Sequence, residues 1–372
     1  MSYFLAFAGF AALIILHEFG HFVAAKAVGM RVERFSLFFP PLIWRWRPGD
    51  SETEYAIGAV PLGGYVKITG MNPEEKLPPE VAPRAYYRQK VWKRIVGIGA
   101  GPLVNIVLAL LILWVLLLSQ GTIKAGLAIA DVQPGTPAVS ALKPGDRILA
   151  IDGVRGYAPG LGEAEIAARA DALRQKINSH RCRGRLVSGC VAATPARIAV
   201  LRGGRRLTLE VRPRYDASAK RMLLGFAFGE KVDVGPGEAA SISATYMWDV
   251  TKRTVDSIVK LFYDSKARDD VSGVVGSYEA TRQTFEFDTA RAFNVLAIIS
   301  LSLGVINLFP FLPLDGGHIF WAVAEKLRGR PIAFSVMEKV GIVGFMLVFF
   351  LFFVGLQNDI GRITSGQGFG VP

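Results

Sequence analysis

Cysteine and histidine, the residues that form disulfides or bind metals, are scarce in this chain. Its 372 residues include only two cysteines and four histidines. The cysteines, Cys182 and Cys190, form a C-x7-C pattern, which is not a zinc-ligand spacing. A disulfide between them in an oxidising compartment and two unpaired thiols in a surface loop are both compatible with the sequence. The chain also lacks internal repeats and low-complexity tracts, which excludes a repeat protein.

Basic residues are missing from the start of the chain, where no Lys or Arg precedes Lys26. A secretory signal peptide begins with a basic region and ends at a small-residue cleavage site. Neither feature is found here, and the apolar run of residues 3–28 continues through His17, Glu18 and His21. We therefore expect this run to remain in the mature protein as a membrane helix.

Apolar residues dominate the composition, at 51% of the chain with a mean hydropathy of +0.34, which is unusual for a soluble protein. Three uncharged apolar runs are each close to the length that crosses a hydrocarbon core of ~30 Å. They cover residues 95–118, 293–314 and 340–356. Together with the first run, they predict a polytopic α-helical membrane protein with four transmembrane helices.

The net charge of +12 raises the question of an anionic partner. The sequence contains no nucleic-acid-binding module, and much of the charge lies beside the predicted spans, so we expect the lipid bilayer and no nucleic acid as its partner. Residues 29–94 carry eleven Lys and Arg, and the connection between the last two spans is also basic. The positive-inside rule then assigns both loops to the cytoplasm and residues 119–292 to the outside.

β-structure is favoured in two parts of the sequence. Residues 31–70 contain aromatic and β-branched runs interrupted by proline and glycine, which predicts hairpins associated with the membrane. Residues 122–229 alternate short β-rich stretches with turns and one helical stretch, residues 162–177. Within this segment, VQPGTPA at residues 132–138 and LKPGDRILAIDG at residues 142–153 resemble the PDZ domains of bacterial proteases in order and spacing.

Four segments follow from these patterns. Residues 1–121 hold the first two transmembrane helices and the hairpin region, and residues 122–229 form an extracytoplasmic PDZ-like α+β domain. Residues 230–292 contain helical stretches of mixed polarity, expected to lie along the outer membrane surface. Residues 293–372 hold the last two transmembrane helices.

A motif inside the first span carries candidate chemistry. Residues 17–21 read His-Glu-Phe-Gly-His, and on a helix this spacing places His17 and His21 on one face, one turn apart. Both imidazoles can then reach one metal, and Glu18 can act on a metal-bound water. Ionisable side chains inside a membrane are costly and normally pair, bind an ion or line a functional cavity. The pattern predicts the site of a zinc metalloprotease.

Two histidines do not complete a zinc site, and the chain has only His180 and His318 besides them. An acidic third ligand is therefore expected. Asp315 is the outstanding candidate because it ends the uncharged third run, and its alternative role is a helix cap at the Gly-Gly turn. Three protein ligands would leave the fourth tetrahedral position for water, as in catalytic zinc sites.

These motifs occur with GPLVN at residues 101–105 and PLGGYV at residues 61–66. In this order, and over almost the entire chain, they resemble the bacterial site-2 proteases, also called RIP metalloproteases. The resemblance implies an intramembrane zinc endopeptidase with zinc (Zn2+) as its cofactor. It also implies the site residues, which are the zinc ligands His17, His21 and Asp315, the catalytic Glu18, and Asn307 in contact with the substrate or the scissile carbonyl.

A transmembrane substrate must unwind locally before water can attack it, and an exposed sheet edge would satisfy its freed backbone groups. We place this edge in residues 57–68, as the resemblance also implies, with Gly63, Gly64, Tyr65 and Val66 as substrate-binding residues. An ordinary cytoplasmic hairpin without substrate contact is the alternative. His318 has no ligand role in the family, and we expect it to pack near the site.

The resemblance further implies the biological setting. This is regulated intramembrane proteolysis of single-span proteins, such as anti-sigma factors or signal-peptide remnants, in a bacterial inner membrane. A preceding site-1 type protease would trim the substrate, and the PDZ-like domain would either filter by size or bind the new C-terminus. An ion or metal transporter and an inactive scaffold are the competing functions. The lack of paired repeat halves argues against the first, and the presence of Glu18 against the second.

Overall fold

The computed structural model comprises two compact units. The helical unit consists of Met1–Leu116 and Ala240–Val371, and the sheet unit is centred on Leu117–Ala239. The structure describes residues 1–133, 135–217, 219–261, 263–264, 267–268 and 271–364.

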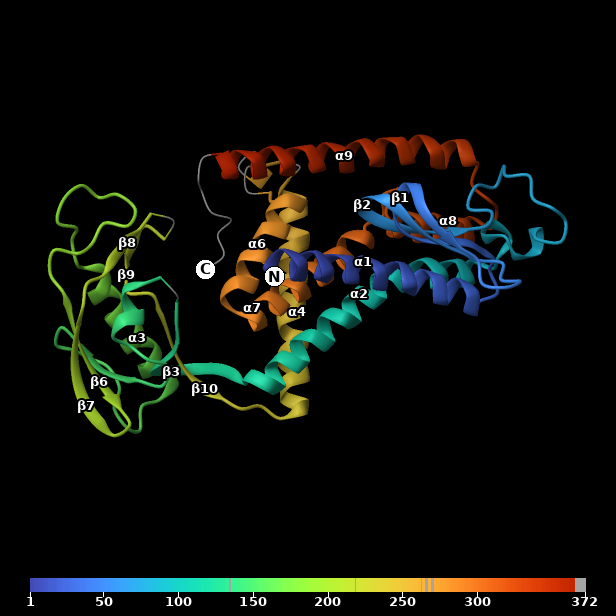
Figure 1. Ribbon diagram of the computed structural model, residues 1–372. Helices are drawn as coiled ribbons and strands as arrows, with labels where there is room; N and C mark the ends of the chain where they lie inside the picture. The colour runs from blue at the N-terminus through green and yellow to red at the C-terminus, as the bar shows by residue number, and fades with distance from the viewer. Residues whose placement is uncertain (134, 218, 262, 265–266, 269–270, 365–372) are drawn as a thin grey trace. The chain divides into compact units, whose positions relative to one another are not determined.

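Among the residues that the structure describes, four helices are long and apolar enough to cross a membrane, as the sequence predicts. At ~1.5 Å per residue, the 26 residues of the first one extend about 39 Å, more than the ~30 Å of a hydrocarbon core. The first and last can be followed along their length in Figure 1. These helices are α1 (Ser2–Ala27), α2 (Val91–Gln120), α7 (Thr289–Asn307) and α9 (Phe334–Thr364).

The third of these helices is shorter than the sequence predicts. The apolar run continues to residue 314, but α7 ends at Asn307. Pro310 and Pro313 follow, and proline can neither donate a helical hydrogen bond nor accommodate the preceding turn of a helix. Residues 308–314 therefore form turns, and a separate helix, α8 (Asp315–Arg328), begins at the predicted metal ligand.

Helices α4 (Pro236–Lys260) and α6 (Val274–Phe287) lie before α7, in the segment where the sequence predicts helical stretches. A break at Asp288 separates α6 from α7. The Asp288 side chain accepts hydrogen bonds from the backbone amides of Ala290 (2.8 Å) and Arg291 (3.2 Å). Because an aspartate in this position satisfies free amides at a helix start, α7 begins as a new helix.

The start of α6 is tied to the last transmembrane helix. Asp359 of α9 is fully buried, and its carboxylate accepts hydrogen bonds from the amides of Gly273 (3.1 Å) and Gly276 (2.7 Å). These amides lie in the first turn of α6 or just before it, where no helical carbonyl is available to them. A buried acid in α9 thus caps a neighbouring helix.

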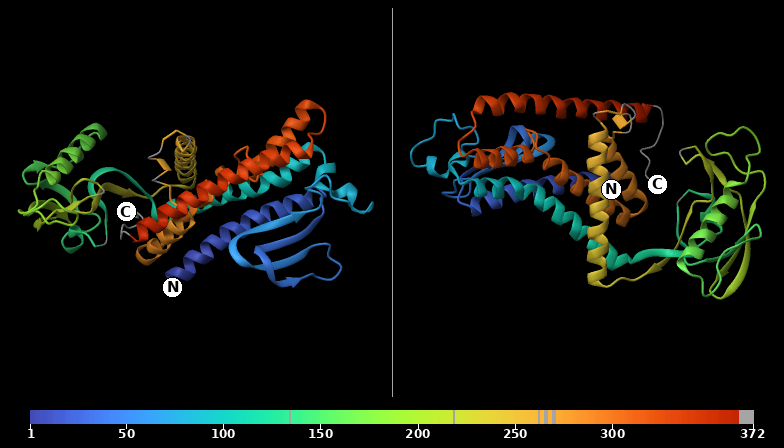
Figure 2. Two further views of the ribbon diagram at one scale, coloured as in Figure 1. Left: turned by 90° about the horizontal axis from the view of Figure 1, so that it is seen from above. Right: turned by 180° about the vertical axis from the view of Figure 1, so that it is seen from behind.

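Residues 31–70 form a β-hairpin region with two bent strands, which confirms the predicted β-structure of this segment. Strands β1 (Val32–Trp46) and β2 (Glu54–Ile68) pair along more than one stretch. Residues 34–37 of β1 pair both with residues 64–67 and with residues 54–57 of β2, and residues 42–46 pair with residues 55–58. The hairpin lies beside α1, as Figure 2 shows. Phe22 of α1 packs with Val32 and Ile68 in a buried apolar cluster, so the hairpin has a fixed position on the helix that carries the metal-binding motif.

The sheet unit contains a sheet with strand order β10-β3-β4-β6-β7, and β5 pairs with β4. Helix α3 packs against β3, and the core between them includes Ile129, Ile148 and Leu173. The first and last strands are neighbours, because Thr122 pairs with Val232. The elements are β3 (Thr122–Val132), β4 (Arg147–Ile151), β5 (Val154–Arg155), α3 (Glu163–Asn178), β6 (Ala196–Arg202), β7 (Arg205–Val211), β8 (Arg214–Asp216), β9 (Arg221–Leu223) and β10 (Phe226–Val232).

Cys182 and Cys190 form a disulfide in the loop between α3 and β6, one of the two states that the sequence leaves open. Short 3-10 helices complete the description, at Ala82–Arg84, Tyr86–Arg88 and Pro137–Ser140.

Candidate metal centre

One face of α1 carries both motif histidines. Leu13, His17, His21 and Ala25 are buried and recur every four residues, as on a helix face packed against protein. His17 and His21 lie on this face and are only 7% and 6% exposed. The rest of the predicted site must therefore come from the segments that cover this face.

Asp315 reaches these histidines from the start of α8. Its Oδ2 atom lies 3.3 Å from Nε2 of His17 and 3.3 Å from Nε2 of His21. Asp315 is the first residue of α8, but no side chain caps that helix, so the alternative role as a helix cap is not found. The glycine at position 316 permits this turn, because a Cβ there would lie 2.2 Å from the carbonyl oxygen of Leu308.

The three ligand atoms have the spacing that zinc requires. Nε2 of His17 and Nε2 of His21 are 3.2 Å apart, so all three separations lie between 3.2 and 3.3 Å. For bonds of ~2.0–2.1 Å, the edge of a tetrahedron around zinc is about 3.3–3.4 Å. Oδ2 of Asp315 is also buried without a hydrogen-bond partner, which is costly unless the atom binds a cation. The donor set fits zinc, and its fourth position is left to a non-protein ligand.

The other ring nitrogen of each histidine contacts α2. Nδ1 of His21 lies 3.0 Å from the carbonyl oxygen of Gly97, and Nδ1 of His17 lies 3.2 Å from the side-chain amide of Asn105. Such contacts orient metal-binding imidazoles. Sequence reasoning used the GPLVN string only as a family motif and assigned no role to Asn105. A role for Asn105 is indicated by the presence of an amide side chain in an otherwise apolar, uncharged run.

Close packing of α1 on α2 depends on Gly101. A Cβ at this position would lie 2.3 Å from Nε2 of His21, closer than real Cβ contacts come. Only glycine therefore leaves room for this imidazole between the two helices.

Glu18 lies against β2. The backbone of Val66 is close enough to the Glu18 carboxylate to interact with it, and a Cβ at Gly64 would lie 3.1 Å from Cγ of Glu18. Residues 64–67 of β2 pair with β1 on one side. Their other side has no strand partner among the described residues, and Gly64 and Val66 both lie beside the glutamate.

The other predicted substrate-binding residues lie elsewhere. Tyr65 stacks on Phe39 with ring centroids 6.3 Å apart, and a Cβ at Gly63 would lie 2.7 Å from the Phe39 ring. Gly63 and the side chain of Tyr65 thus lie against Phe39 of β1. Asn307 is the last residue of α7, and within the described part of the chain no hydrogen bond joins it to the metal centre.

The remaining histidines lie outside the ligand cluster. The ring of His318 meets that of Tyr86 edge to face, with centroids 6.4 Å apart, which agrees with the packing role expected for it. His180, in the sheet unit, lies 2.9 Å from Asp152.

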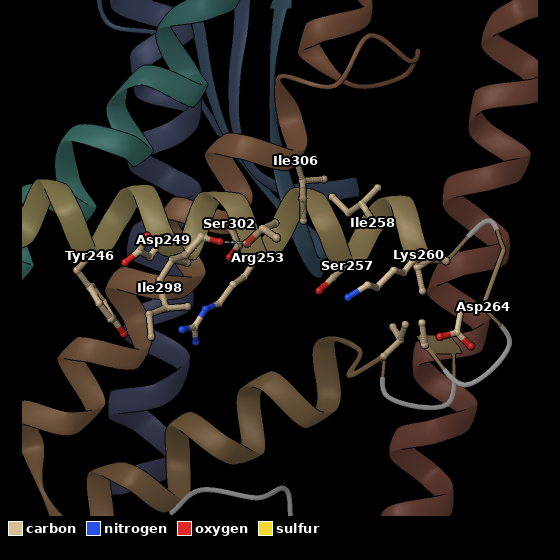
Figure 3. Close-up of a pocket in the computed structure, with 15 residues that line it drawn as sticks. Tyr246, Asp249, Arg253, Ser257, Ile258, Lys260, Asp264, Ile298, Ser302 and Ile306 are labelled. Carbon is tan, nitrogen blue, oxygen red and sulfur yellow. Dashed lines mark hydrogen bonds between the residues drawn. The ribbon is translucent and has the colours of Figure 1, made fainter. Parts of the chain in front are cut away.

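A separate cavity of about 850 Å³ lies between α4, α7 and the residues that follow α4, and Figure 3 shows its lining. Tyr246, Arg253 and Ile298 are among the residues that border it, but none of the predicted site residues does. The cavity is therefore distinct from the metal centre.

Two histidines and an aspartate that fit zinc, a neighbouring glutamate and four apolar helices define a metal-dependent hydrolase of the membrane. The chain belongs to Peptidase family M50, whose model matches residues 5–351. It is a zinc metalloendopeptidase, and zinc is its cofactor.

Relatives with similar sequences span nearly the full length of the chain. A protein of Nostoc sp. that is named a zinc metalloprotease is 32% identical over 98% of this chain and 97% of its own. A protein of Rhizobium meliloti with the same kind of name is 29% identical over 94% of this chain and 93% of its own. The regulator of sigma E protease of Salmonella typhi is 27% identical over 94% of this chain and 96% of its own length.

Proposed function

We propose that this chain is an intramembrane endopeptidase of the site-2 type, which hydrolyses a peptide bond within the membrane segment of single-span proteins. The observation that carries the proposal is the convergence of His17, His21 and Asp315 at 3.2–3.3 Å, next to Glu18, on a helix long and apolar enough to span a membrane. No other cluster of three such ligands occurs in the described part of the chain.

The residues divide the chemistry as follows. His17, His21 and Asp315 would hold the zinc, which when bound supplies Lewis acidity to the reacting water and the scissile carbonyl. Glu18 takes the proton from the attacking water at its carboxylate and passes it to the leaving amide nitrogen. This carboxylate lies beside the Val66 backbone, at the edge of β2.

The edge of β2 that faces Glu18 is the proposed binding site for the unwound substrate. Added beside residues 64–67 of β2, the substrate would satisfy its exposed backbone groups on this edge and present a peptide bond to Glu18. Gly64 and Val66 border the path, and Gly64 leaves room because it has no side chain. Gly63, Tyr65 and Asn307 are proposed as more distant contributors.

The rise per residue of an α-helix gives the depth of the site in the membrane. His17 lies ten residues before Ala27, the last residue of α1 (27 minus 17), which is about 15 Å along the axis. With the basic loop of residues 29–94 in the cytoplasm, cleavage would fall inside the membrane toward the cytoplasmic side. The sheet unit would then lie outside the cytoplasm, as a PDZ-like domain.

Substrates of the anti-sigma-factor class suit this proposal, because one relative is named a regulator of sigma E protease. Such a protein would first lose its outer portion to a site-1 type protease. The sheet unit would then act as a size filter that admits only the trimmed product.

The proposal is tested by co-expression with a panel of single-span proteins, each with tags on both sides of its membrane segment. The intact chain is compared with Glu18→Gln, which removes the base and keeps the three ligands. We expect uncut membrane fragments to accumulate with Glu18→Gln while zinc content stays normal. Turnover of a trimmed substrate near the normal rate by Glu18→Gln would refute the assignment.

A further inference from the structure

Asn105 is a buried polar residue for which the catalytic steps above provide no role. It lies in α2 and is fully buried. Its Nδ2 atom is 3.2 Å from Nδ1 of His17, and its Oδ1 atom is buried without a hydrogen-bond partner. An unpaired amide oxygen inside a membrane protein is costly, so its position next to a metal ligand needs an explanation.

The protonation of His17 provides that explanation, which rests on the proposed function. A neutral imidazole carries one proton, and if Nε2 of His17 faces the metal, the proton is on Nδ1. An N–H group that faces an amide NH2 is repelled, whereas one that faces the amide oxygen forms a hydrogen bond. A half-turn of the Asn105 amide exchanges Oδ1 and Nδ2 without changing its shape.

We infer that Asn105 is a positioning residue for the zinc site, whose side-chain oxygen accepts a hydrogen bond from Nδ1–H of His17. This contact keeps the lone pair of Nε2 directed at the metal. His21 has the equivalent contact with the Gly97 carbonyl, at 3.0 Å. Both imidazoles are thus oriented by α2, one through backbone and one through a side chain.

Close packing of the neighbouring helix α7 on α2 restricts the side on which the Asn105 amide can lie. Ser300 Oγ donates to the backbone oxygen of Asn105 at 2.9 Å. Gly304 lies so close that a Cβ on it would be 2.9 Å from the carbonyl oxygen of Pro102 and 3.4 Å from Cβ of Asn105. Because α7 occupies this side, the Asn105 amide is confined to the side where His17 lies.

The test measures zinc affinity of the full-length protein by competition with a chelator in detergent or nanodiscs, so it does not depend on a substrate. Loss of a group that orients a metal ligand typically weakens binding 10–100-fold. Asn105→Leu has a similar volume and no acceptor, and we expect a loss of this size. Asn105→Asp retains an acceptor oxygen, and its zinc affinity should stay within a few-fold of normal.

Ser300→Ala is the matched control. It removes a buried hydrogen bond to the backbone oxygen of Asn105, but it leaves the Asn105 side-chain amide and the close approach of Gly304 to α2 in place. Its zinc affinity should equal that of the unaltered protein. Asn105→Ala gives the same comparison as Asn105→Leu if the leucine variant fails to insert.

Each outcome bears on the inference. Weak zinc binding by Asn105→Leu, together with near-normal binding by Asn105→Asp and Ser300→Ala, supports it. Normal zinc affinity of Asn105→Leu, or an equal loss in Ser300→Ala, overturns it. His17→Ala separates this failure from failure of the proposed function: if that variant keeps full zinc affinity, His17 is not a ligand, and both proposals fall.

Discussion

A single methyl group on α2 is expected to disable the metal centre. In Gly101→Ala, the new Cβ would lie 2.3 Å from Nε2, 2.6 Å from Cε1 and 2.8 Å from Cδ2 of His21. Ordinary contacts begin at 3.4 Å, so the ring has to move by about 1.1 Å (3.4 minus 2.3) unless the two helices separate. The backbones of α1 and α2 are in close contact at this point, because a Cβ at Gly20 of α1 would lie 2.7 Å from the carbonyl oxygen of Ala100. Separation of the two helices would break this contact.

The size of this shift decides the outcome. Distances between a metal and its ligands vary by only ~0.2 Å, so a displacement of about 1 Å removes His21 from the site or distorts it severely. A misplacement of this size is sufficient to lower turnover about 100-fold. We therefore expect zinc affinity to fall at least about 10-fold and cleavage about 100-fold.

Gly99→Ala provides the control, because it is the same substitution two residues away on the same helix. A Cβ at Gly99 meets only Cδ1 of Ile319, at 3.7 Å, which is an ordinary contact. Zinc content and cleavage of a trimmed substrate are measured for both variants, with membrane insertion checked by protease protection. Full zinc occupancy and normal turnover in Gly101→Ala would refute the packing argument and the position of His21.

Three further predictions concern other parts of the proposed mechanism. Asp315→Ala should lower zinc occupancy and cleavage together, as metal analysis of the purified protein will reveal; full occupancy would mean that the third ligand lies elsewhere. Val66→Pro should cut cleavage about 100-fold with zinc retained, because proline has no amide to donate to the substrate strand. Val66→Ala keeps the amide and should remain active. Replacement of residues 122–232 by a short linker, which the pairing of Thr122 with Val232 permits, should keep zinc bound and allow cleavage of untrimmed substrates. Unchanged rejection of untrimmed substrates would argue against a size filter.

The sequence predicted the parts of the site that follow from local spacing. A separation of four residues is sufficient to place His17 and His21 on one helix face, and the alternation and turn residues of residues 31–70 are sufficient to indicate a hairpin. Membrane spans could also be read directly, because length and hydropathy are local properties.

Contacts between residues far apart in the sequence could not be predicted from local patterns. The predicted end of the third span was wrong, because an uncharged run does not reveal that Pro310 and Pro313 interrupt the helix there. The contact between Asn105 and His17 joins residues 88 positions apart, and no spacing rule connects them. The proximity of Glu18 to the backbone of Val66 likewise depends on how the hairpin packs on α1.

The division of the metal centre between the two ends of the chain affects how the protein is made. His21 and Asp315 are separated by 294 residues (315 minus 21). At ~5–20 residues per second, a ribosome needs about 15–60 s to travel from one to the other. A nascent chain that has inserted its first helix thus contains the two histidines and the proposed general base long before the proposed third ligand is made. Incomplete chains released by stalled ribosomes would carry the motif without the activity, so the membrane is protected from partly made proteases.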